Sequence, residues 1–308
     1  MNKPFDVLVA GEINPDLILS GNIEPAFGQV EKLIDSADLE IGSSSAIFAC
    51  GATRLGLKVT FIGVVGDDLF GRFMLESMSK KGVDVSPVII DQTRQTGLSV
   101  ILNRSNDRAT LTYPGCIAAL RPDDIGDDLL KSSRHLHIAS YFLQTALQPG
   151  LLALFQRARV LGLTTSLDPN WDPAGKWHSI NELLPMVDIF LPNENEALAL
   201  TGASGVDDAL RQLSRLSRTV TVKLGRQGGK ACRDEEFVRS PASMVHVVDT
   251  IGAGDTFDAG FIYAALNGWE LLRCLKLAIV CGSLSTRAAG GTAGQPAIAE
   301  ALYAMDGL

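Results

Sequence analysis

Apolar residues along the chain fall into short runs separated by amphipathic stretches. The first apolar run spans residues 5–10 and ends at Gly11. Further short apolar runs, typical of buried strands, lie at residues 135–139, 163–167, 189–191 and 219–224. Segments with helical periodicity separate the later runs, at residues 150–161, 194–201 and 206–216. Such alternation predicts an α/β fold with a mostly parallel central sheet flanked by helices.

The first third of the chain has a less regular pattern. We expect a helix over residues 43–55 with Gly56 as its stop, a strand over 58–65 and an amphipathic helix over 69–81. Residues 96–103 and 108–113 predict two strands around the polar turn 104–107, which is a hairpin pattern. Residues 16–20 and 30–41 have weaker strand character. We expect this material to form a small β-sheet that projects from the core.

Composition restricts the function classes. The chain has 308 residues, 46% hydrophobic and 20% charged, which suits one large core and a single domain over residues 1–308. The net charge of -8 argues against nucleic-acid binding, which relies on basic patches. No signal peptide or membrane-spanning apolar stretch is evident, so no membrane partner is expected. Five scattered cysteines without a Cys-x-x-Cys pair favour a reducing, cytoplasmic location.

The segment 249–255 combines a glycine-rich loop with an acid, directly before an apolar helical pattern. A helix N-terminus that follows small residues offers free N–H groups to an anion. Asp255 at this place suits a base that takes a proton from a hydroxyl attacking a phosphate, while the amides of Gly252, Ala253 and Gly254 hold the phosphoryl charge. The alternative is a structural turn with an ordinary acid in the first helical turn.

The stretch 249–260 resembles the C-terminal signature of the ribokinase-like (PfkB) sugar kinases. The resemblance implies an ATP-dependent kinase in which Asp255 is the catalytic base and the backbone of residues 252–254 forms the anion hole. It also implies that the small sheet, from discontinuous segments at about 12–41 and 94–115, is a lid over the sugar and a contact in a homodimer. The implied partner is a small sugar or nucleoside.

Two N-terminal motifs extend the resemblance. The pattern Gly-x-x-Asn-x-Asp at residues 11–16 places Asn14 and Asp16 after the first strand, where they are expected to bind substrate hydroxyls; an Asx turn is the alternative. Gly42 and Ser43 are expected to face the sugar as well. The family usually has two glycines at 41–42 and a sugar-binding Asn where this chain has Ala46. Serines 43–45 compensate for that amide or cap the helix.

Two later motifs concern the nucleotide. Asn193 and Glu196 fit a helix cap, and by resemblance they hold the phosphates and, through water, Mg²⁺. The strand expected over residues 219–224 ends near Lys223 and is followed by a turn with Gly225 and Gly228, where the backbone approaches ATP. Lys223 itself either contacts phosphate or is a solvated strand end. The family often needs K⁺, for which the backbone of Asp249, Ile251 and the loop 288–291 is a candidate site.

Other function classes and motifs have weaker support in the sequence. Neither a P-loop Gly-x₄-Gly-Lys-Ser/Thr nor a Gly-x-Gly-x-x-Gly after the first strand is present, which disfavours P-loop NTPases and dinucleotide-dependent oxidoreductases. Asp168–Trp171 resembles a fructokinase segment, with a turn as the alternative. His135 and His137 are expected to be packing residues. A nucleoside kinase of the same fold and a non-catalytic sugar- or nucleoside-binding sensor remain the alternative functions.

Overall fold

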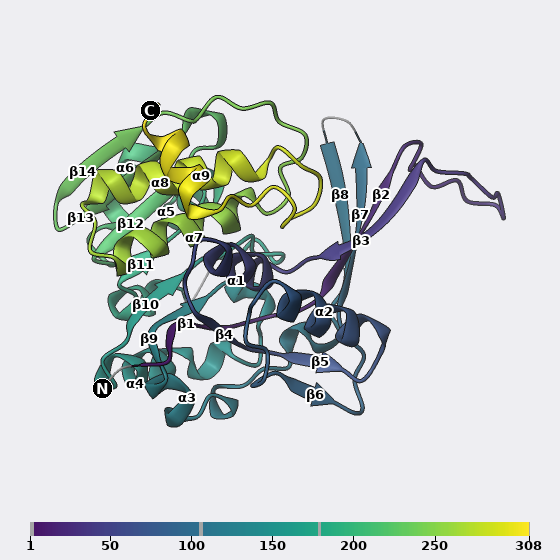
Figure 1. The fold of residues 1–308 in the computed structure, drawn as a ribbon, viewed down its shortest axis with the longest axis horizontal. Helices are drawn as coiled ribbons and strands as arrows, with labels where there is room; N and C mark the ends of the chain where they lie inside the picture. The colour runs from purple at the N-terminus through teal and green to yellow at the C-terminus, as the bar shows by residue number, and fades with distance from the viewer. Residues whose placement is uncertain (1–2, 105–106, 178–179, 308) are drawn as a thin grey trace.

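The computed structural model describes residues 3–104, 107–177 and 180–307, and its core is an eight-stranded sheet (Figure 1). The strand order is β14-β13-β12-β11-β10-β9-β1-β4, with parallel pairing from β4 to β12 and antiparallel pairing of β12, β13 and β14. These strands span β1 Phe5–Ala10, β4 Val59–Ile62, β9 Ser133–Ile138, β10 Thr164–Leu167, β11 Ile189–Phe190, β12 Thr219–Lys223, β13 Gly229–Arg233 and β14 Glu236–Ser240. The predicted α/β class is confirmed, whereas β13 and β14 were not anticipated.

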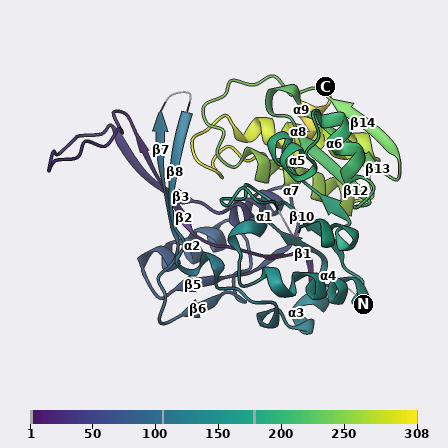
Figure 2. The same ribbon diagram turned by 180° about the vertical axis from the view of Figure 1, so that it is seen from behind.

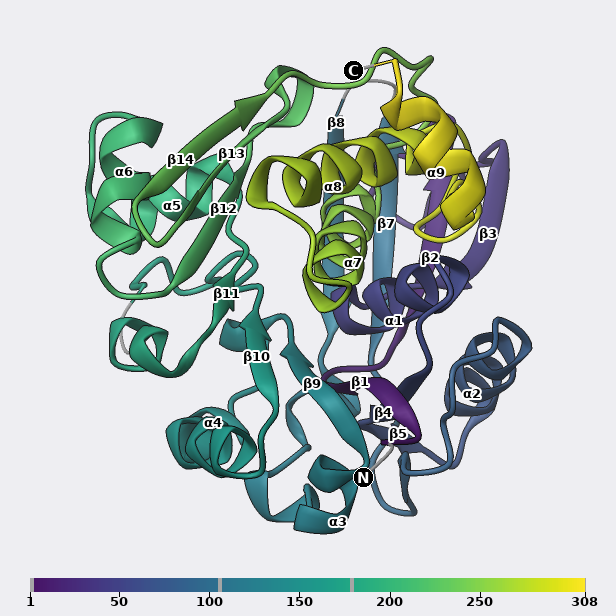
Figure 3. The ribbon, with the colours of Figure 1, turned by 60° about the vertical axis from the view of Figure 1, so that its left-hand side comes forward.

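Helices cover both faces of this sheet (Figure 3). The helices are α1 Ser44–Arg54, α2 Leu69–Lys80, α3 Asp127–Lys131, α4 Leu151–Val160, α5 Glu194–Thr201, α6 Val206–Leu213, α7 Ala253–Leu266, α8 Leu271–Ser285 and α9 Ile298–Met305. Short 3₁₀ turns occur at Gly115–Ala118, Pro122–Asp124, Tyr141–Leu143, Gln148–Gly150, Ile180–Glu182, Leu184–Met186 and Gly225–Gln227. None of the helices within the described ranges has the length and apolarity to cross a membrane.

The alternation of side chains along β1 explains the two layers. Val7 and Val9 pack into one hydrophobic cluster with α1, α2, α7 and α8, while Leu8 and Ala10 pack into another with α3, α4, α5 and α6. Because successive residues of a strand point to opposite faces, an uninterrupted apolar run is needed to fill both clusters. This is why β1 has a continuous apolar run over residues 7–10.

A second, four-stranded sheet projects from the core (Figures 1 and 2). It has the order β3-β2-β7-β8 and consists of β2 Pro15–Ser20, β3 Ser36–Ile41, β7 Leu98–Arg104 and β8 Asp107–Tyr113. Two antiparallel pairs meet through a parallel pairing of β2 with β7. These strands lie within the two segments expected for the lid. The predicted turn at 104–107 includes Ser105 and Asn106, which lie outside the described residues.

Two predicted strands have different bounds. The strand expected over 30–41 begins only at Ser36, because residues 21–35 form an exposed connection. The strand expected over 58–65 is divided at Gly63 into β4 and β5 Val64–Gly66, and β5 pairs with β6 Ile89–Asp91 in a separate two-stranded sheet. A Cβ at Gly63 would lie 2.6 Å from the Gly11 carbonyl oxygen, so this close approach requires glycine.

Candidate active site

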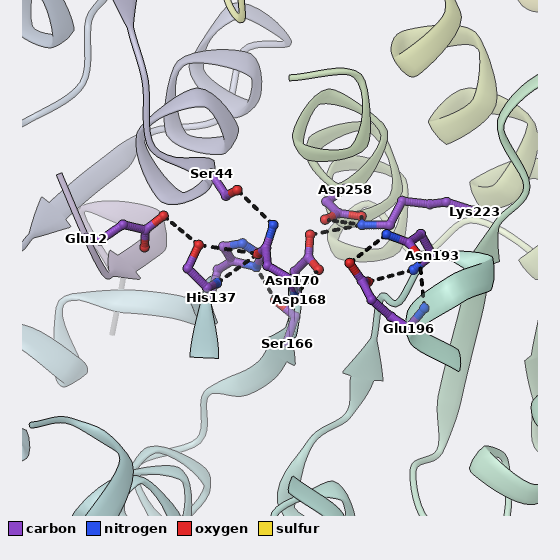
Figure 4. Close-up of polar contacts among 11 residues, drawn as sticks. Glu12, Ser44, His137, Ser166, Asp168, Asn170, Asn193, Glu196, Lys223 and Asp258 are labelled. Atoms are coloured by element: carbon purple, nitrogen blue, oxygen red, sulfur yellow. Dashed lines mark hydrogen bonds and ion pairs between the residues drawn. The ribbon is translucent and has the colours of Figure 1, made fainter. Parts of the chain in front are cut away.

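The polar side chains of the site follow the carboxyl ends of the parallel strands and face the start of α7 (Figure 4). Glu12 follows β1, Asp168 and Asn170 follow β10, and Lys223 ends β12. Parallel strands bring their carboxyl ends to the same edge of a sheet, which is where ligands bind in open α/β folds. Residues far apart in the sequence therefore meet at one place.

Asp255 lies in the first turn of α7, which begins at Ala253 with Gly252 as its N-cap. Gly252 has φ 71°, and a Cβ there would lie 2.7 Å from the Gly291 carbonyl oxygen, so both conformation and space require glycine. N–H groups at such a helix start are suited to bind an anion, which is the role predicted for this turn, although that of Ala253 also donates to the Thr250 carbonyl oxygen at 3.3 Å. Burial, assisted by the nearby Asp168, raises the pKa of Asp255 to about 8, while Lys223 opposes this shift.

Lys223 is held between two buried carboxylates. Its Nζ lies 2.9 Å from Asp168 Oδ2 and 3.0 Å from Asp258 Oδ2, and its side chain is only 12% exposed. Burial alone would lower the pKa of Lys223, but Asp168 and Asp258, with Glu196, raise it above its ordinary value. Lys223 is therefore a fixed ammonium group rather than a solvated strand end.

Two cavities meet beside Asp255. The first, of about 630 Å³, is lined by the turn after β12, by residues 242–247, by the start of α7 and by the end of α8. The second, of about 760 Å³, lies under the four-stranded sheet and contains Asp255. Both cavities are lined by Lys223, Thr250 and Gly254. Two molecules bound in them would therefore face each other across the glycine turn.

This chain is similar to proteins of known family and structure. A family model described as "pfkB family carbohydrate kinase" matches residues 7–298 of this chain. The chain belongs to the PfkB family of carbohydrate kinases. Its α/β fold, with the second small sheet, is the ribokinase-like fold.

Individual PfkB-family relatives support this assignment. A 2-dehydro-3-deoxygluconokinase from Bacillus subtilis (strain 168) is 32% identical over 271 residues, covering 80% of this chain and 81% of the relative. A fructokinase from Klebsiella pneumoniae is 31% identical over 278 residues, covering 83% and 88%. A candidate ribokinase II from E. coli, solved with ATP and Mg²⁺, shares the fold with a TM-score of 0.87 at 24% identity, covering 99% and 100%.

The residues expected to bind substrate line the second cavity or support it. Asn14, Asp16 and Ser43 line this cavity. Burial raises the pKa of Asp16 to about 7, against the charge of Arg108. A Cβ at Gly42 would lie 2.1 Å from Asp16 Oδ1, so Gly42 makes room for Asp16 rather than facing the cavity.

Ser43 and Ala46 require a correction to the alignment with the PfkB pattern. Ser43, not residue 41, has the left-handed φ of 68° that favours glycine, so the family's glycine pair corresponds to positions 42–43. The usual Asn then corresponds to Ile47, which lines the cavity, whereas Ala46 is fully buried outside its lining. The Ser43 hydroxyl donates to the Glu12 carbonyl oxygen and accepts from the Ala46 N–H, which is a capping role.

The first cavity contains the predicted glycine turn. Gly225 and Gly228 line it with φ values of 54° and 86°. No atom lies within 4 Å of a Cβ built at Gly225, which leaves the backbone open to a ligand. At Gly228 the same Cβ would lie 2.1 Å from the Ser240 carbonyl oxygen, so that glycine is also required for packing.

Asn193 and Glu196 form a reciprocal capping box at the start of α5. Asn193 N–H and Nδ2 donate to the two Glu196 carboxylate oxygens at 2.8 and 2.5 Å. Both residues also line the second cavity, near Lys223. Burial and the charge of Asp168 raise the pKa of Glu196 to about 7. The two interpretations made from the sequence, a helix cap and a ligand contact, are thus compatible.

Asp249 and Ile251 lie in the loop before α7. The Asp249 carboxylate accepts from the Ile251 N–H at 3.0 Å and from the Gly290 N–H at 2.9 Å. This side chain therefore connects the loops at residues 249–251 and 288–291, whose backbone carbonyl groups are the candidate K⁺ ligands. The Ile251 side chain instead packs against Ile18 and Ile101 of the four-stranded sheet, which connects that sheet to the glycine turn.

Several site residues were missed or undervalued in the sequence. Asp168, first interpreted as a turn residue, both accepts from the Asn170 N–H and pairs with Lys223. Asp258 follows Asp255 by three residues, so helical spacing already placed both on one face. Ser44 and Asn170 lie in the motifs 43–45 and 168–171 but were given no role of their own, and Glu12 was missed; hydrogen bonds connect these residues in Figure 4. His135 and His137 are buried packing residues, as expected, and His137 stacks on Phe48.

Proposed function

We propose that this PfkB-family kinase transfers the γ-phosphoryl group of ATP to a hydroxyl of a sugar or sugar-like acceptor bound in the second cavity. The observation that carries the proposal is the junction of the two cavities at Thr250, Gly254 and Lys223, next to Asp255. ATP in the first cavity would direct its phosphates at the glycine turn, and an acceptor hydroxyl would approach from the other side. The sequence family and the geometry agree on this reaction.

Asp255 acts as the general base in this proposal. Its carboxylate accepts the proton of the acceptor hydroxyl as the oxygen attacks the phosphorus. The N–H groups of Gly252, Ala253 and Gly254 with the positive end of α7 stabilise the charge on the transferring group. General-base catalysis is typically worth about 10²–10⁴ in rate. Asp255 must be ionised to act, so the raised pKa predicts activity that falls as the pH decreases.

Lys223 contributes a fixed positive charge at the junction. Asp168 and Asp258 orient its ammonium group and accept two of its N–H donors. A remaining N–H is available to a phosphate oxygen in either cavity, because Lys223 lines both. We therefore assign Lys223 to the phosphates of ATP, together with the backbone at Gly225 and Gly228.

Mg²⁺ fits the residues that are present, provided that it is held mainly by phosphate and water. No cluster of three or more potential metal-binding side chains occurs among the residues that the structure describes. Mg²⁺ retains several waters and commonly uses few protein ligands. Glu196 would bind a hydrated ion through water, and Asn193 holds its carboxylate in place. When bound, Mg²⁺ neutralises charge on the phosphate oxygens.

A K⁺ site near the glycine turn remains a proposal. The side chain of Asp249 ties the 249–251 loop to Gly290, which brings backbone carbonyl groups from both loops into one region. Carbonyl oxygens of Asp249 and Ile251 are the proposed ligands. Equal activity in K⁺ and in a large organic cation, at the same ionic strength, would remove this part of the proposal.

We also propose that the four-stranded sheet is a lid over the acceptor and a homodimer contact. Its inner face contributes Asp16, Ser99 and Thr112 to the cavity. Because strand side chains alternate, the outer face carries apolar residues, several half-buried and two exposed. They are Leu17, Leu19, Leu98, Val100, Leu102, Leu111 (63% exposed) and Tyr113 (52% exposed).

Light scattering in solution tests the dimer. We expect wild-type mass near twice 32.8 kDa and a shift toward the monomer in Leu111→Glu. Val160→Glu, at an 86% exposed position on α4, is the matched control and should leave the mass unchanged. A monomeric wild-type protein at micromolar concentration would refute the contact.

The five buried free cysteines support the expected cytoplasmic location.

The acceptor is best identified by ADP release across a panel of sugars, sugar acids and nucleosides, with Mg²⁺ and K⁺ present. The names of the B. subtilis and K. pneumoniae relatives make 2-dehydro-3-deoxygluconate and fructose the first candidates. Turnover of a sugar that is lost in Asp255→Asn would support the proposal. A preference for nucleosides would support the nucleoside-kinase alternative, and binding without turnover across the panel would support a sensor.

A further inference from the structure

A chain of hydrogen bonds leads from Glu12 to Ser44, which lines the second cavity together with Asp255. Ser140 Oγ donates to Glu12 Oε1 at 2.8 Å, and Ser140 N–H donates to Asn170 Oδ1 at 2.8 Å. Asn170 Nδ2 then donates to Ser44 Oγ at 2.9 Å. Ser44 and Asp255 both line the second cavity, and the Ser44 hydroxyl acts to lower the pKa of the Asp255 carboxyl group. Figure 4 shows the part of this chain from Glu12 to Ser44.

The donor and acceptor roles along this chain have a single direction. A backbone N–H can only donate, so the group of Asn170 that faces Ser140 must be its carbonyl oxygen. The amide NH₂ of Asn170 is then directed at Ser44, whose oxygen must accept. Because a serine hydroxyl has one proton, the O–H of Ser44 is not used by Asn170 and is left to donate toward another group, such as the Asp255 carboxyl group whose pKa it lowers. The backbone N–H of Ser140, after β9, thus orients the Asn170 side-chain amide, after β10, and this amide in turn restricts the direction of the Ser44 hydroxyl on α1.

The backbone supports the same arrangement. Ser140 and Asn170 both have left-handed φ values, 51° and 52°, which are uncommon for residues other than glycine. Asn tolerates this conformation better than most residues. Asn170 N–H also donates to Asp168 Oδ1 at 3.2 Å, which holds the turn in place. The side-chain amide of Asn170 is therefore positioned by three contacts within the described residues.

We propose that Asn170 and Ser44 are positioning residues that direct one hydroxyl proton at Asp255 and so favour the ionised form of its carboxyl group, oriented toward the acceptor. This inference rests on the proposed role of Asp255 as the base. It assigns a function to two polar residues that line the acceptor cavity without requiring that either contacts the acceptor.

The surroundings of Asp255 explain why such a donor matters. Burial raises the pKa of Asp255, and Asp168 after β10 and Glu12 after β1 add to this effect. Asp258 on α7 is a further carboxyl group close enough to interact with Asp255. Lys223 on β12 and the Ser44 hydroxyl on α1 are the groups that oppose the shift. Removing the hydroxyl would leave Lys223 as the main counterweight to three acids.

The test measures the ionisation of Asp255 without relying on turnover. Protein labelled with ¹³C at the aspartate carboxyl carbon is titrated by NMR, and the Asp255 signal is assigned by its absence in Asp255→Asn. Ser44→Ala should raise the pKa of Asp255 by about one pH unit, as expected for loss of a hydrogen bond to a charged group. Ser44→Thr, which keeps a hydroxyl, should restore it. Thr53→Ala removes a hydroxyl bonded within the same helix and is the control.

Asn170→Ala tests the relay itself. It should raise the same pKa in the wild-type background but add little in the Ser44→Ala background, because the effect passes through Ser44. In ADP-release assays the acid limb of kcat/KM should move by the same interval, so that activity at pH 7 falls about tenfold in Ser44→Ala. Additive effects of the two substitutions would overturn the relay.

The outcomes separate this inference from the proposed function. An unchanged Asp255 pKa in Ser44→Ala would overturn the relay, whatever the kinase assays give. A raised pKa together with no turnover of any acceptor would support the relay as a feature of the site and refute the kinase assignment. A loss of activity in Ser44→Ala at all pH values, with the pKa unchanged, would indicate an acceptor contact and would also overturn it.

Discussion

Replacement of Asp255 by Asn should increase stability while abolishing catalysis, because the buried carboxyl group opposes folding when it is ionised. The pKa of Asp255 is raised from 3.8 to about 8. At pH 7 the solution lies about three pH units above the ordinary value, and each unit is worth about 1.4 kcal/mol. The folded state's preference for the protonated form therefore reduces the free energy of unfolding by about 4 kcal/mol at pH 7.

The sign of this effect determines its pH dependence. A carboxyl group whose folded pKa is raised contributes its full stability below the unfolded pKa, and that stability is lost as the pH rises toward the folded pKa. The difference in unfolding free energy between Asp255→Asn and wild type should therefore be close to zero near pH 4. It should grow through pH 5 and 6 and level off near pH 8.

Urea unfolding of both proteins at four pH values between 4 and 8, followed by fluorescence, measures this difference. Asp128→Asn, at a fully exposed carboxylate on α3, is the control and should follow wild type at every pH. ADP release by Asp255→Asn should fall by about 10²–10⁴. A difference in stability that is constant with pH, or a variant less stable than wild type at pH 8, would refute the reasoning.

Three further substitutions test other parts of the site. Lys223→Met leaves two buried carboxylates without their cation, so the free energy of unfolding at pH 7 should fall by about 3–5 kcal/mol in urea; unchanged stability would contradict the role of the ion pairs. Gly42→Ala introduces a Cβ 2.1 Å from Asp16 Oδ1, which should raise KM for the acceptor at least tenfold and leave KM for ATP unchanged. Asn193→Ala removes both the N-cap and the partner of Glu196; it should destabilise the protein by about 1 kcal/mol and raise the Mg²⁺ concentration for half-maximal activity. An unaltered Mg²⁺ dependence would separate Glu196 from the metal.

Local patterns were sufficient for most of the core. The apolar run of β1 is continuous over residues 7–10 because its alternate residues fill the clusters on both faces of the sheet, whereas β9, β10 and β12 contribute apolar residues to only one cluster. Glycine stops and helical periodicity predicted α1, α2 and α5 within a few residues. Strands β13 and β14 were missed, because apolar and charged residues are mixed in this short antiparallel hairpin and form no continuous apolar run.

The glycine turn before Asp255 is also a local feature. A positive φ at Gly252 and the free N–H groups of a helix start depend on neighbouring residues, so the sequence itself predicted this element and the acid beside it. The capping box of Asn193 and Glu196 is local for the same reason, since both residues lie within one helical turn. Motifs of this kind are short enough for sequence spacing to determine their geometry.

Only the tertiary structure decided which charges meet. Lys223 is 55 residues from Asp168 and 35 from Asp258, and Ser140 is 128 residues from Glu12. Nothing in the spacing of these residues indicates contact, because it is the order of parallel strands that brings their carboxyl ends together. The backbone also decided that Ile47 rather than Ala46 lines the second cavity, where the left-handed Ser43 leads into α1. The sequence alone thus determined the fold class and the glycine turn before Asp255, whereas long-range strand order and backbone conformation determined the electrostatic surroundings of that turn.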